Sequence, residues 1–465
     1  MRSSRFTALI GSIGVGAAIL FCGAGAAVAS PDHWMVPKRF AQPPTTADCV
    51  ASAGIACYQP AQFQQAYDMN PLYRAGLNGR GKTIVIVDAF GSPTIQSDLA
   101  KFDADNHLPT PSFNVITPAG APPPYDPSSI PDQFSWAIET SLDVEYAHTM
   151  APGANILLVE TPADETEGVQ GFPEIVEAEN YVINHNLGDV ISQSFGATEE
   201  TFPSPGSIYS LRSAYFNALL HRVTVLGSSG DGGASDYESD LEDFYPFRVN
   251  SWPSSDPLVT SIGGTQLHLD PNGNRTAPDN VWNDTYNPNV TGATPSPASG
   301  GGGTSAVFSR PFFQNGVANV VGRSRGTPDV SLSAAVDGGA LVYMSFAGLP
   351  GPGYYIIGGT SEASPLFSGV VAVADQAAGH RLGWLNPSLY ALGDGPRSGI
   401  VDVAGGNNTV TFTQTDPNAP DFNKTYTVNG YNAGRGYDLS SGLGTIDGAR
   451  LVGELAGFRQ YVRRR

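Results

Sequence analysis

The sequence has few cysteines, few basic residues and, beyond its first thirty residues, no long hydrophobic run. Its 3 cysteines exclude a disulfide-rich scaffold, and no cysteine–histidine cluster has the spacing of a transition-metal site. Lys and Arg number 24 against 43 Asp and Glu, and this net charge of −19 argues against nucleic acid and anionic membranes as partners. Because no second apolar run follows, the sequence predicts no membrane span beyond the leader.

The first 29 residues have the pattern of an export signal. Arg2 and Arg5 form a basic start, residues 8–28 are apolar and rich in small side chains, and residues 27–29 fit a signal-peptidase site. We expect cleavage after Ala29, which removes two arginines and makes the net charge −21. The mature protein is then expected to be secreted, extracellular or held at the cell envelope, with no stable membrane insertion.

The rest of the chain is predicted to form one large domain with short flanking segments. Residues 30–60 are a polar, proline-rich lead-in, residues 61–458 form the domain, and residues 459–465 form a basic tail. The lead-in contains Cys49 and Cys57, and export predicts a disulfide between them. The chain has 14% charged residues, 55 Gly and 37 Pro, a composition typical of a compact, loop-rich exported enzyme.

Strand-like and helix-like segments alternate from residue 82 onward. Apolar, β-branched runs occupy 83–87, 155–159, 189–192 and 223–227, and helical patterns occupy 95–106, 133–150, 174–186 and 208–221. This alternation predicts an α/β fold with a mainly parallel central sheet and helices on both faces. Functional sites in such folds lie outside the carboxyl ends of the strands. The polar stretches 283–303 and 405–430 are expected to be loops or insertions.

The most informative stretch is Gly358-Gly359-Thr360-Ser361, a tight turn that opens directly into an apolar helix. A serine hydroxyl on such a turn is well placed to act as a nucleophile. Serine is also a favoured helix N-cap, so the motif alone fits a structural role equally well. Whether Ser361 is a nucleophile or a helix cap depends on whether the rest of the chain supplies a base and an oxyanion donor.

Two carboxylates on the predicted helix 133–150 are candidates for the base. Glu139 and Asp143 are four residues apart and therefore share one face of the helix. One interpretation is a solvated acidic face. The other is that the two groups share a proton, which raises one pKa and keeps the other group ionised. Such a carboxylate can serve as general base to a serine in acid, where a histidine would be protonated.

A third carboxylate, Asp231, directly follows the strand 223–227 within Gly230-Asp231-Gly232. Glycine-flanked aspartates usually mark a turn. The functional interpretation is a carboxylic acid that is kept protonated and donates a hydrogen bond to an oxyanion.

Taken together, these motifs resemble the sedolisin family of serine-carboxyl peptidases. The matching segments follow the family's order from about Tyr67 to Leu451: Glu139-Thr140-Ser141-Leu142-Asp143, Ser192-Gln193-Ser194-Phe195-Gly196, Ser229-Gly230-Asp231, Trp252-Pro253, Gly263-Gly264-Thr265, Phe308-Ser309-Arg310-Pro311, Pro328-Asp329 and Gly359-Thr360-Ser361 with Ser364-Pro365. Phe195 stands where tryptophan is more usual. The resemblance implies a subtilisin-like fold, which agrees with the parallel α/β prediction.

The resemblance also implies a function, an exported endopeptidase that acts on protein or peptide substrates at acidic pH. Ser361 would attack the peptide carbonyl, and Glu139 would take its proton and return one to the leaving amine. Asp143 would hold and polarise Glu139, and Asp231 would stabilise the oxyanion. We expect the protein to be a monomer.

A structural calcium ion near the C-terminus is a further implication of the resemblance. The matching residues are the carboxylates Asp402 and Asp438 and the backbone carbonyls of Val403, Gly434 and Gly436. Calcium takes carboxylate and carbonyl oxygens from loops, so this set suits one structural Ca²⁺.

The chain departs from the family pattern at its front. Sedolisins usually carry a large folded prosegment, whereas residues 30–60 are too few for an independent core. This departure and Phe195 keep open an alternative, a catalytically silent secreted binding protein with a peptidase scaffold. A neutral Ser/His/Asp peptidase is a third interpretation, but no histidine lies in the required His-Gly-Thr motif. His148 has the wrong context, and Asp88 after the first strand is interpreted as structural.

Overall fold

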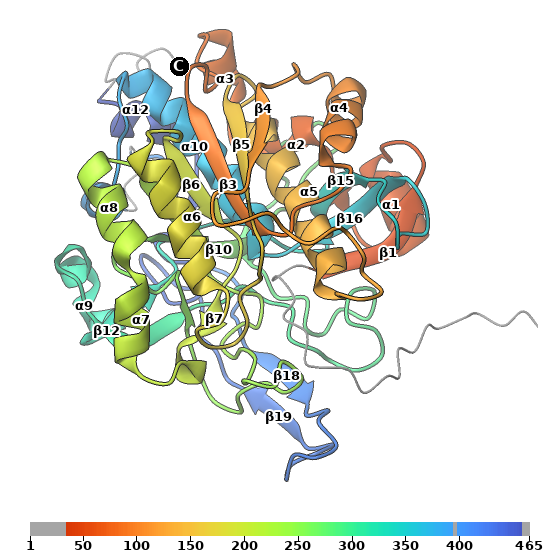
Figure 1. Cartoon of the computed structure of the whole chain (residues 1–465), viewed down its shortest axis with the longest axis vertical. Helices are drawn as coiled ribbons and strands as arrows, with labels where there is room; N and C mark the ends of the chain where they lie inside the picture. Colours follow the sequence, from red (N-terminus) through yellow and green to blue (C-terminus); the bar gives the residue numbers. More distant parts are fainter. Residues whose placement is uncertain (1–33, 394–397, 458–465) are drawn as a thin grey trace, which may run out of the picture.

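A central eight-stranded sheet organises the fold of the computed structural model (Figure 1). The structure describes residues 34–393 and 398–457, and the predicted leader and basic tail lie outside this part of the chain. The strand order is β11-β10-β8-β6-β3-β5-β4, with β14 also paired to β10, and every pairing is parallel except that of β11. The strands are β3 (Thr83–Ala89), β4 (Phe113–Ile116), β5 (Asn155–Thr161), β6 (Val190–Gln193), β8 (Thr224–Ser228), β10 (Thr260–Gln266), β11 (Asn280–Val281) and β14 (Val330–Ser333). The predicted parallel α/β fold is confirmed.

Helices cover both faces of this sheet because its strands are apolar on both sides. In β3, Ile84 and Ile86 enter the core shared with α4 (Ile95–Asn106), α5 (Asp132–Met150) and α10 (Thr360–Ala378). Val85 and Val87 point the other way, into the core shared with α6 (Phe172–Asn184) and α8 (Ser213–His221). This alternation follows from the two-residue period of a strand. The candidate nucleophile and base lie on the first of these faces.

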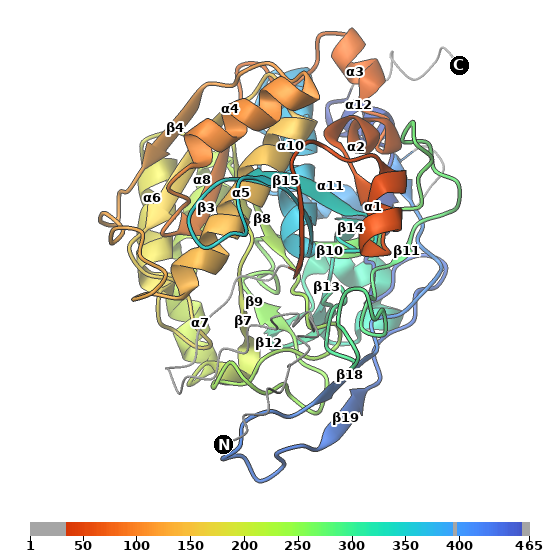
Figure 2. The same ribbon diagram turned by 90° about the vertical axis from the view of Figure 1, so that its right-hand side faces the viewer.

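The helices α5 and α10 pack against each other at very short range (Figure 2). Gly369 makes this approach possible, because a Cβ atom there would lie 2.5 Å from Met150 Cβ and 3.1 Å from the Ala147 carbonyl oxygen. Both helices are buried along most of their length. The two elements that carry Ser361 and Glu139 are therefore held in fixed register.

The sequence-based prediction of one helix over 208–221 is wrong. The chain instead forms α7 (Pro205–Leu211) and α8, with Arg212 at the break between them. The guanidinium of Arg212 donates to both carboxylate oxygens of Asp256, at 2.5 and 2.8 Å. Local periodicity contains no information on this long-range ion pair.

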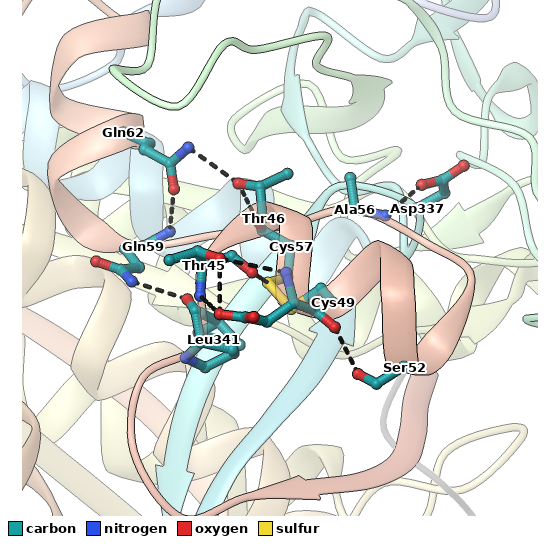
Figure 3. The surroundings of a disulfide bond; sticks show 12 residues. Thr45, Thr46, Cys49, Ser52, Ala56, Cys57, Gln59, Gln62, Asp337 and Leu341 are labelled. Atoms are coloured by element: carbon teal, nitrogen blue, oxygen red, sulfur yellow. Dashed lines mark hydrogen bonds between the residues drawn. A yellow bond between two sulfur atoms is a disulfide. The ribbon is translucent and has the colours of Figure 1, made fainter.

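A second, four-stranded sheet lies beside the helices, in the order β1-β16-β15-β2. Its strands are β1 (Trp34–Phe40), β2 (Cys57–Tyr58), β15 (Gly339–Met344) and β16 (Gly353–Gly358). The lead-in thus contributes two strands and α1 (Thr46–Ala53) to the fold. The predicted disulfide joins Cys49 of α1 to Cys57 of β2, next to the Thr45–Asp48 capping box (Figure 3).

Smaller elements complete the described part of the chain: α2 (Pro60–Ala66), α3 (Asn70–Arg74), α9 (Ala318–Val321), α11 (Asn386–Leu392), α12 (Gly448–Leu455), β7 (Ala197–Thr198), β9 (Ser251–Trp252), β12 (Gly303–Ser309), β13 (Ser324–Thr327), β17 (Ile400–Val401), β18 (Val410–Thr413), β19 (Thr425–Val428) and β20 (Thr445–Ile446). The insertion at 405–430 contains the β18–β19 hairpin, which extends away from the body of the molecule (Figure 1). In the described ranges, no helix combines the length and apolar character that a membrane crossing requires.

Candidate active site

Ser361 lies in the first turn of α10, immediately after strand β16. Gly359 is the residue before the helix and has a φ of +142°, a conformation that suits glycine. The residue four positions after Ser361 is Pro365, which has no amide hydrogen to donate to the Ser361 carbonyl. The hydroxyl of Ser194 lies 3.5 Å from that carbonyl oxygen. The predicted turn around Ser361 is therefore present. Ser194, the residue that follows β6, contacts it.

Glu139 and Asp143 are both fully buried on α5, which rules out a solvated acidic face. Asp143 adjoins Glu139, and its Oδ1 accepts a hydrogen bond from Ser194 Oγ at 3.0 Å. Burial, and then the charges of Glu139 and Asp88, raise the pKa of Asp143 well above its ordinary value. Asp143 therefore keeps a proton more readily than an ordinary aspartate, and Ser194 connects it to the backbone of Ser361.

Asp88, which the sequence suggests is structural, is a further carboxylate next to Glu139. It lies near the carboxyl end of β3 and is fully buried. Burial raises its pKa well above the usual range, and the neighbouring Glu139 raises it further. Its position at the end of a buried parallel strand was the available signal, because side chains there approach the site.

Asp231 lies in the loop after β8, next to Thr360. Its Oδ1 accepts hydrogen bonds from the Thr360 amide at 2.7 Å and from the Thr360 hydroxyl at 2.9 Å. The Gly230 amide in turn donates to Thr360 Oγ1 at 3.1 Å. The structure therefore joins Asp231 to the residue directly before the nucleophile.

His148 is on α5 but does not belong to this constellation. Its Nε2 lies 2.8 Å from the carbonyl oxygen of Pro109 and 3.3 Å from Asp103 Oδ1. Its ring is therefore engaged by α4 and the loop that follows it, away from Ser361. A Ser/His/Asp arrangement through this histidine has no support.

Phe195, where tryptophan is usual, lies in an aromatic cluster next to the site. Its ring centroid is 6.4 Å from that of Trp136 and 6.3 Å from that of Phe172. Trp136 is on α5, nearly one turn before Glu139. The substitution therefore leaves the apolar wall of the site packed with aromatic side chains.

The residues expected to hold calcium converge on one turn. The Gly436 amide donates to Asp402 Oδ1 at 3.0 Å, and the Gly434 amide donates to Asp438 Oδ2 at 2.9 Å, so both carboxylates flank residues 434–438. Ser441 Oγ lies 3.4 Å from the Val403 carbonyl oxygen. No group of three or more His, Cys, Asp or Glu side chains that could hold a metal occurs in the described residues. Two carboxylates with backbone carbonyls are an oxygen-only set that fits Ca²⁺.

Comparison with known proteins agrees with this geometry. The model of the subtilase family matches residues 135–392, a span that contains Glu139, Asp143, Asp231 and Ser361. The chain belongs to the subtilase family. Within it, the chain is a homologue of the sedolisin-type serine-carboxyl peptidases, as its sequence motifs predict.

Two bacterial relatives illustrate this similarity. Kumamolisin of Bacillus sp. (strain MN-32) is 31% identical over 410 residues, which cover 86% of this chain and 64% of that protein. Sedolisin of Pseudomonas sp. (strain 101) is 29% identical, covering 88% of this chain and 62% of that protein. The chain thus spans less than two thirds of the length of these curated relatives.

A solved structure of a relative has the same fold. Pseudomonas sedolisin, described as a serine-carboxyl proteinase in complex with two molecules of pseudo-iodotyrostatin, superposes with a TM-score of 0.67 at 27% identity. The superposition covers 87% of this chain and 99% of that one. The α/β architecture is therefore shared over nearly the whole of that chain.

Proposed function

We propose that the protein is an exported serine-carboxyl endopeptidase that hydrolyses peptide bonds at acidic pH through an acyl-enzyme on Ser361. The observation that carries this proposal is the buried Glu139–Asp143 pair, joined through Ser194 to the backbone of Ser361. A buried carboxyl pair beside a serine at a helix N-terminus can share a proton and activate a hydroxyl.

In the proposed reaction, Glu139 accepts the proton of Ser361 Oγ as this oxygen attacks the carbonyl carbon of the substrate. Asp143 keeps its own proton and hydrogen-bonds to Glu139, which orients the base. Glu139 then protonates the leaving amine, and water releases the acyl group by the reverse proton transfers. Asp231 donates a hydrogen bond to the oxyanion, and Thr360 orients its carboxyl group.

The surroundings of Glu139 and Asp143 support catalysis at acidic pH. The pKa of Asp143 is raised by burial and by Glu139, so Asp143 stays protonated in acid and loses its proton as pH rises. Two adjacent ionised carboxylates would then repel each other and disturb the orientation of the base. We therefore expect activity to fall when pH rises through the pKa of Asp143.

We also propose that Asp402, Asp438 and the carbonyls of Val403, Gly434 and Gly436 hold one calcium ion. The ion would stabilise the C-terminal loops and take no part in the reaction. Substrates would be proteins or peptides, and we expect neither nucleic acid nor an oligomer partner. The Cys49–Cys57 disulfide supports an oxidising, extracellular or cell-envelope location.

The decisive experiment is digestion of an unfolded protein by the purified chain between about pH 3 and pH 8, beside the Ser361→Ala variant. Acid-range cleavage that is lost in the variant supports the proposal. Internal cleavage distinguishes an endopeptidase from an enzyme that removes short N-terminal peptides. A folded, calcium-loaded sample that cleaves nothing at any pH would instead favour the silent binding protein.

A further inference from the structure

A small cavity opens at the carboxyl ends of β3 and β5, next to the carboxylate cluster. Its volume is about 150 Å³. The wall consists of two aromatic rings, two prolines and three polar side chains: Phe90, Tyr125, Pro93, Pro123, Ser92, Gln133 and Glu160. The carboxyl end of a parallel sheet is where ligands bind in folds of this class, so the location suits a binding site.

Glu160 is the charged residue of this wall, and its carboxylate lacks a partner. Within the described ranges, it makes no hydrogen bond and no ion pair. Burial alone raises its pKa to about 7, and a bound ammonium group would lower this pKa again, so a basic side chain would keep the carboxylate ionised in the acid range. Gln133, by contrast, is already engaged, since its amide group binds the Asp126 amide and the Pro123 and Pro124 carbonyls. The cavity therefore presents one unpaired acid.

The backbone at Gly91 leaves space for the Glu160 carboxylate. At Gly91, a Cβ atom would lie 1.9 Å from Glu160 Oε1, so any other residue would displace the carboxylate. The preceding Phe90 has a φ of +58°, an uncommon conformation for a bulky residue, and its ring forms part of the wall. Such strain is found most often at functional sites.

The cavity is adjacent to the proposed catalytic carboxylates. Glu160 pairs with Asp88 in the register of β5 and β3, and the charges of both Glu139 and Glu160 raise the pKa of Asp88. Gln133 and Glu139 lie on the same helix, six residues apart, which corresponds to about 9 Å along its axis. A peptide bound across Ser361 could therefore place one side chain in the cavity.

We propose that this cavity is a specificity pocket for a basic side chain of the substrate, with Glu160 as its counter-ion. The inference rests on the proposed peptidase function and adds the substrate class. A lysine stem suits the proline-lined wall, and its ammonium group would lie near two aromatic rings and one unpaired carboxylate. Glu160 is then a residue that determines specificity and has no part in bond cleavage.

The test separates binding from turnover. Hexapeptides that carry one lysine at successive positions are titrated into Ser361→Ala protein at pH 7, each beside the same peptide with uncharged norleucine. We expect one lysine position to bind about tenfold more tightly than norleucine. This preference should disappear when Glu160→Gln is added, and it should persist with Glu177→Gln, which removes the same charge from the exposed face of α6.

The proposed pocket would be overturned if the lysine and norleucine peptides bind equally at every position. It would also be overturned if a lysine preference survives Glu160→Gln. Turnover of the same peptides by the wild-type chain is measured separately. If the wild type cleaves nothing while the Glu160-dependent preference is present, the proposed function fails and the pocket remains. If cleavage occurs without a lysine preference in kcat/KM or binding, the pocket fails and the peptidase remains.

Discussion

Buried carboxylates in two regions of the molecule have opposite surroundings. Beneath α7 and at the β13–β14 corner, Asp256 and Asp329 are fully buried and each receives two hydrogen bonds from an arginine, Arg212 or Arg325. At the candidate active site, Asp88 and Asp143 are equally buried, but their charged neighbours are other carboxylates, and their pKa values are raised.

The difference shows that burial alone does not decide what an acid does. An arginine partner keeps the carboxylate ionised and turns it into a structural anchor. Carboxylate neighbours keep a proton in the site and make it available for transfer. The chain has 24 basic residues for 43 acidic ones, so the placement of the arginines separates the two kinds of acid.

The largest expected effect comes from removing the proposed base. Glu139→Gln keeps the shape of the side chain but cannot accept a proton, so kcat should fall by about 10³- to 10⁴-fold. Far-UV and near-UV circular dichroism should stay unchanged. The control is Glu177→Gln, which should retain full activity. A loss smaller than tenfold in Glu139→Gln would point to another base.

Breaking a structural pair should instead affect stability. Arg325→Met leaves Asp329 buried without its partner, and we expect the free energy of unfolding to drop by about 3–5 kcal/mol in urea denaturation. The exposed pair Arg450–Asp447 is the matched control, and Arg450→Met should cost less than about 1 kcal/mol. Similar losses in both variants would mean that burial does not distinguish the two pairs.

Buried acids whose pKa values are raised should make the protein more stable in acid than at neutral pH. Burial raises the pKa of Glu179 to about 8 and that of Asp375 to about 7. Because these folded-state values exceed the unfolded ones, the stabilisation is full below about pH 4 and is lost as pH rises to 7–8. Calorimetry should give a Tm that falls over this range, and Glu179→Gln should flatten the slope. A Tm that rises with pH would contradict this view.

Calcium removal is expected to have the smallest effect, a decrease in Tm of a few degrees on addition of a strong chelator. The carboxylates Asp402 and Asp438 would then resemble the structural acids, with a cation in place of arginine. Asp402→Asn should have a lowered Tm that no longer responds to chelator. An identical Tm with and without chelator in the wild type would contradict the proposed calcium site.

The sequence predicted the parts of the fold that depend on local patterns. The strands β3, β5, β6 and β8 and the helix α5 were visible as apolar periodicity, and Ser361 was visible as a glycine turn before a helix. The break at Arg212 was not, because it depends on Asp256, which is 44 residues away.

The candidate site shows the same limit. Family motifs pointed to Glu139, Asp143, Asp231 and Ser361, and the structure gathers them around the start of α10. Asp88 was assigned a structural role, because its neighbours come from another part of the chain. The cavity at Glu160 was also invisible, since it requires β3, β5 and the loop before α5 to meet.

The crossing of α5 and α10 limits how precisely the proposed catalytic groups can be aligned. A single methyl group at Gly369 would force apart the helices that carry Ser361 and Glu139, the proposed nucleophile and base. Misplacement of reacting groups by about 1 Å can reduce a rate by about 100-fold. The alignment tolerance of the proposed reaction is therefore set by a residue that has no side chain and lies eight positions beyond Ser361.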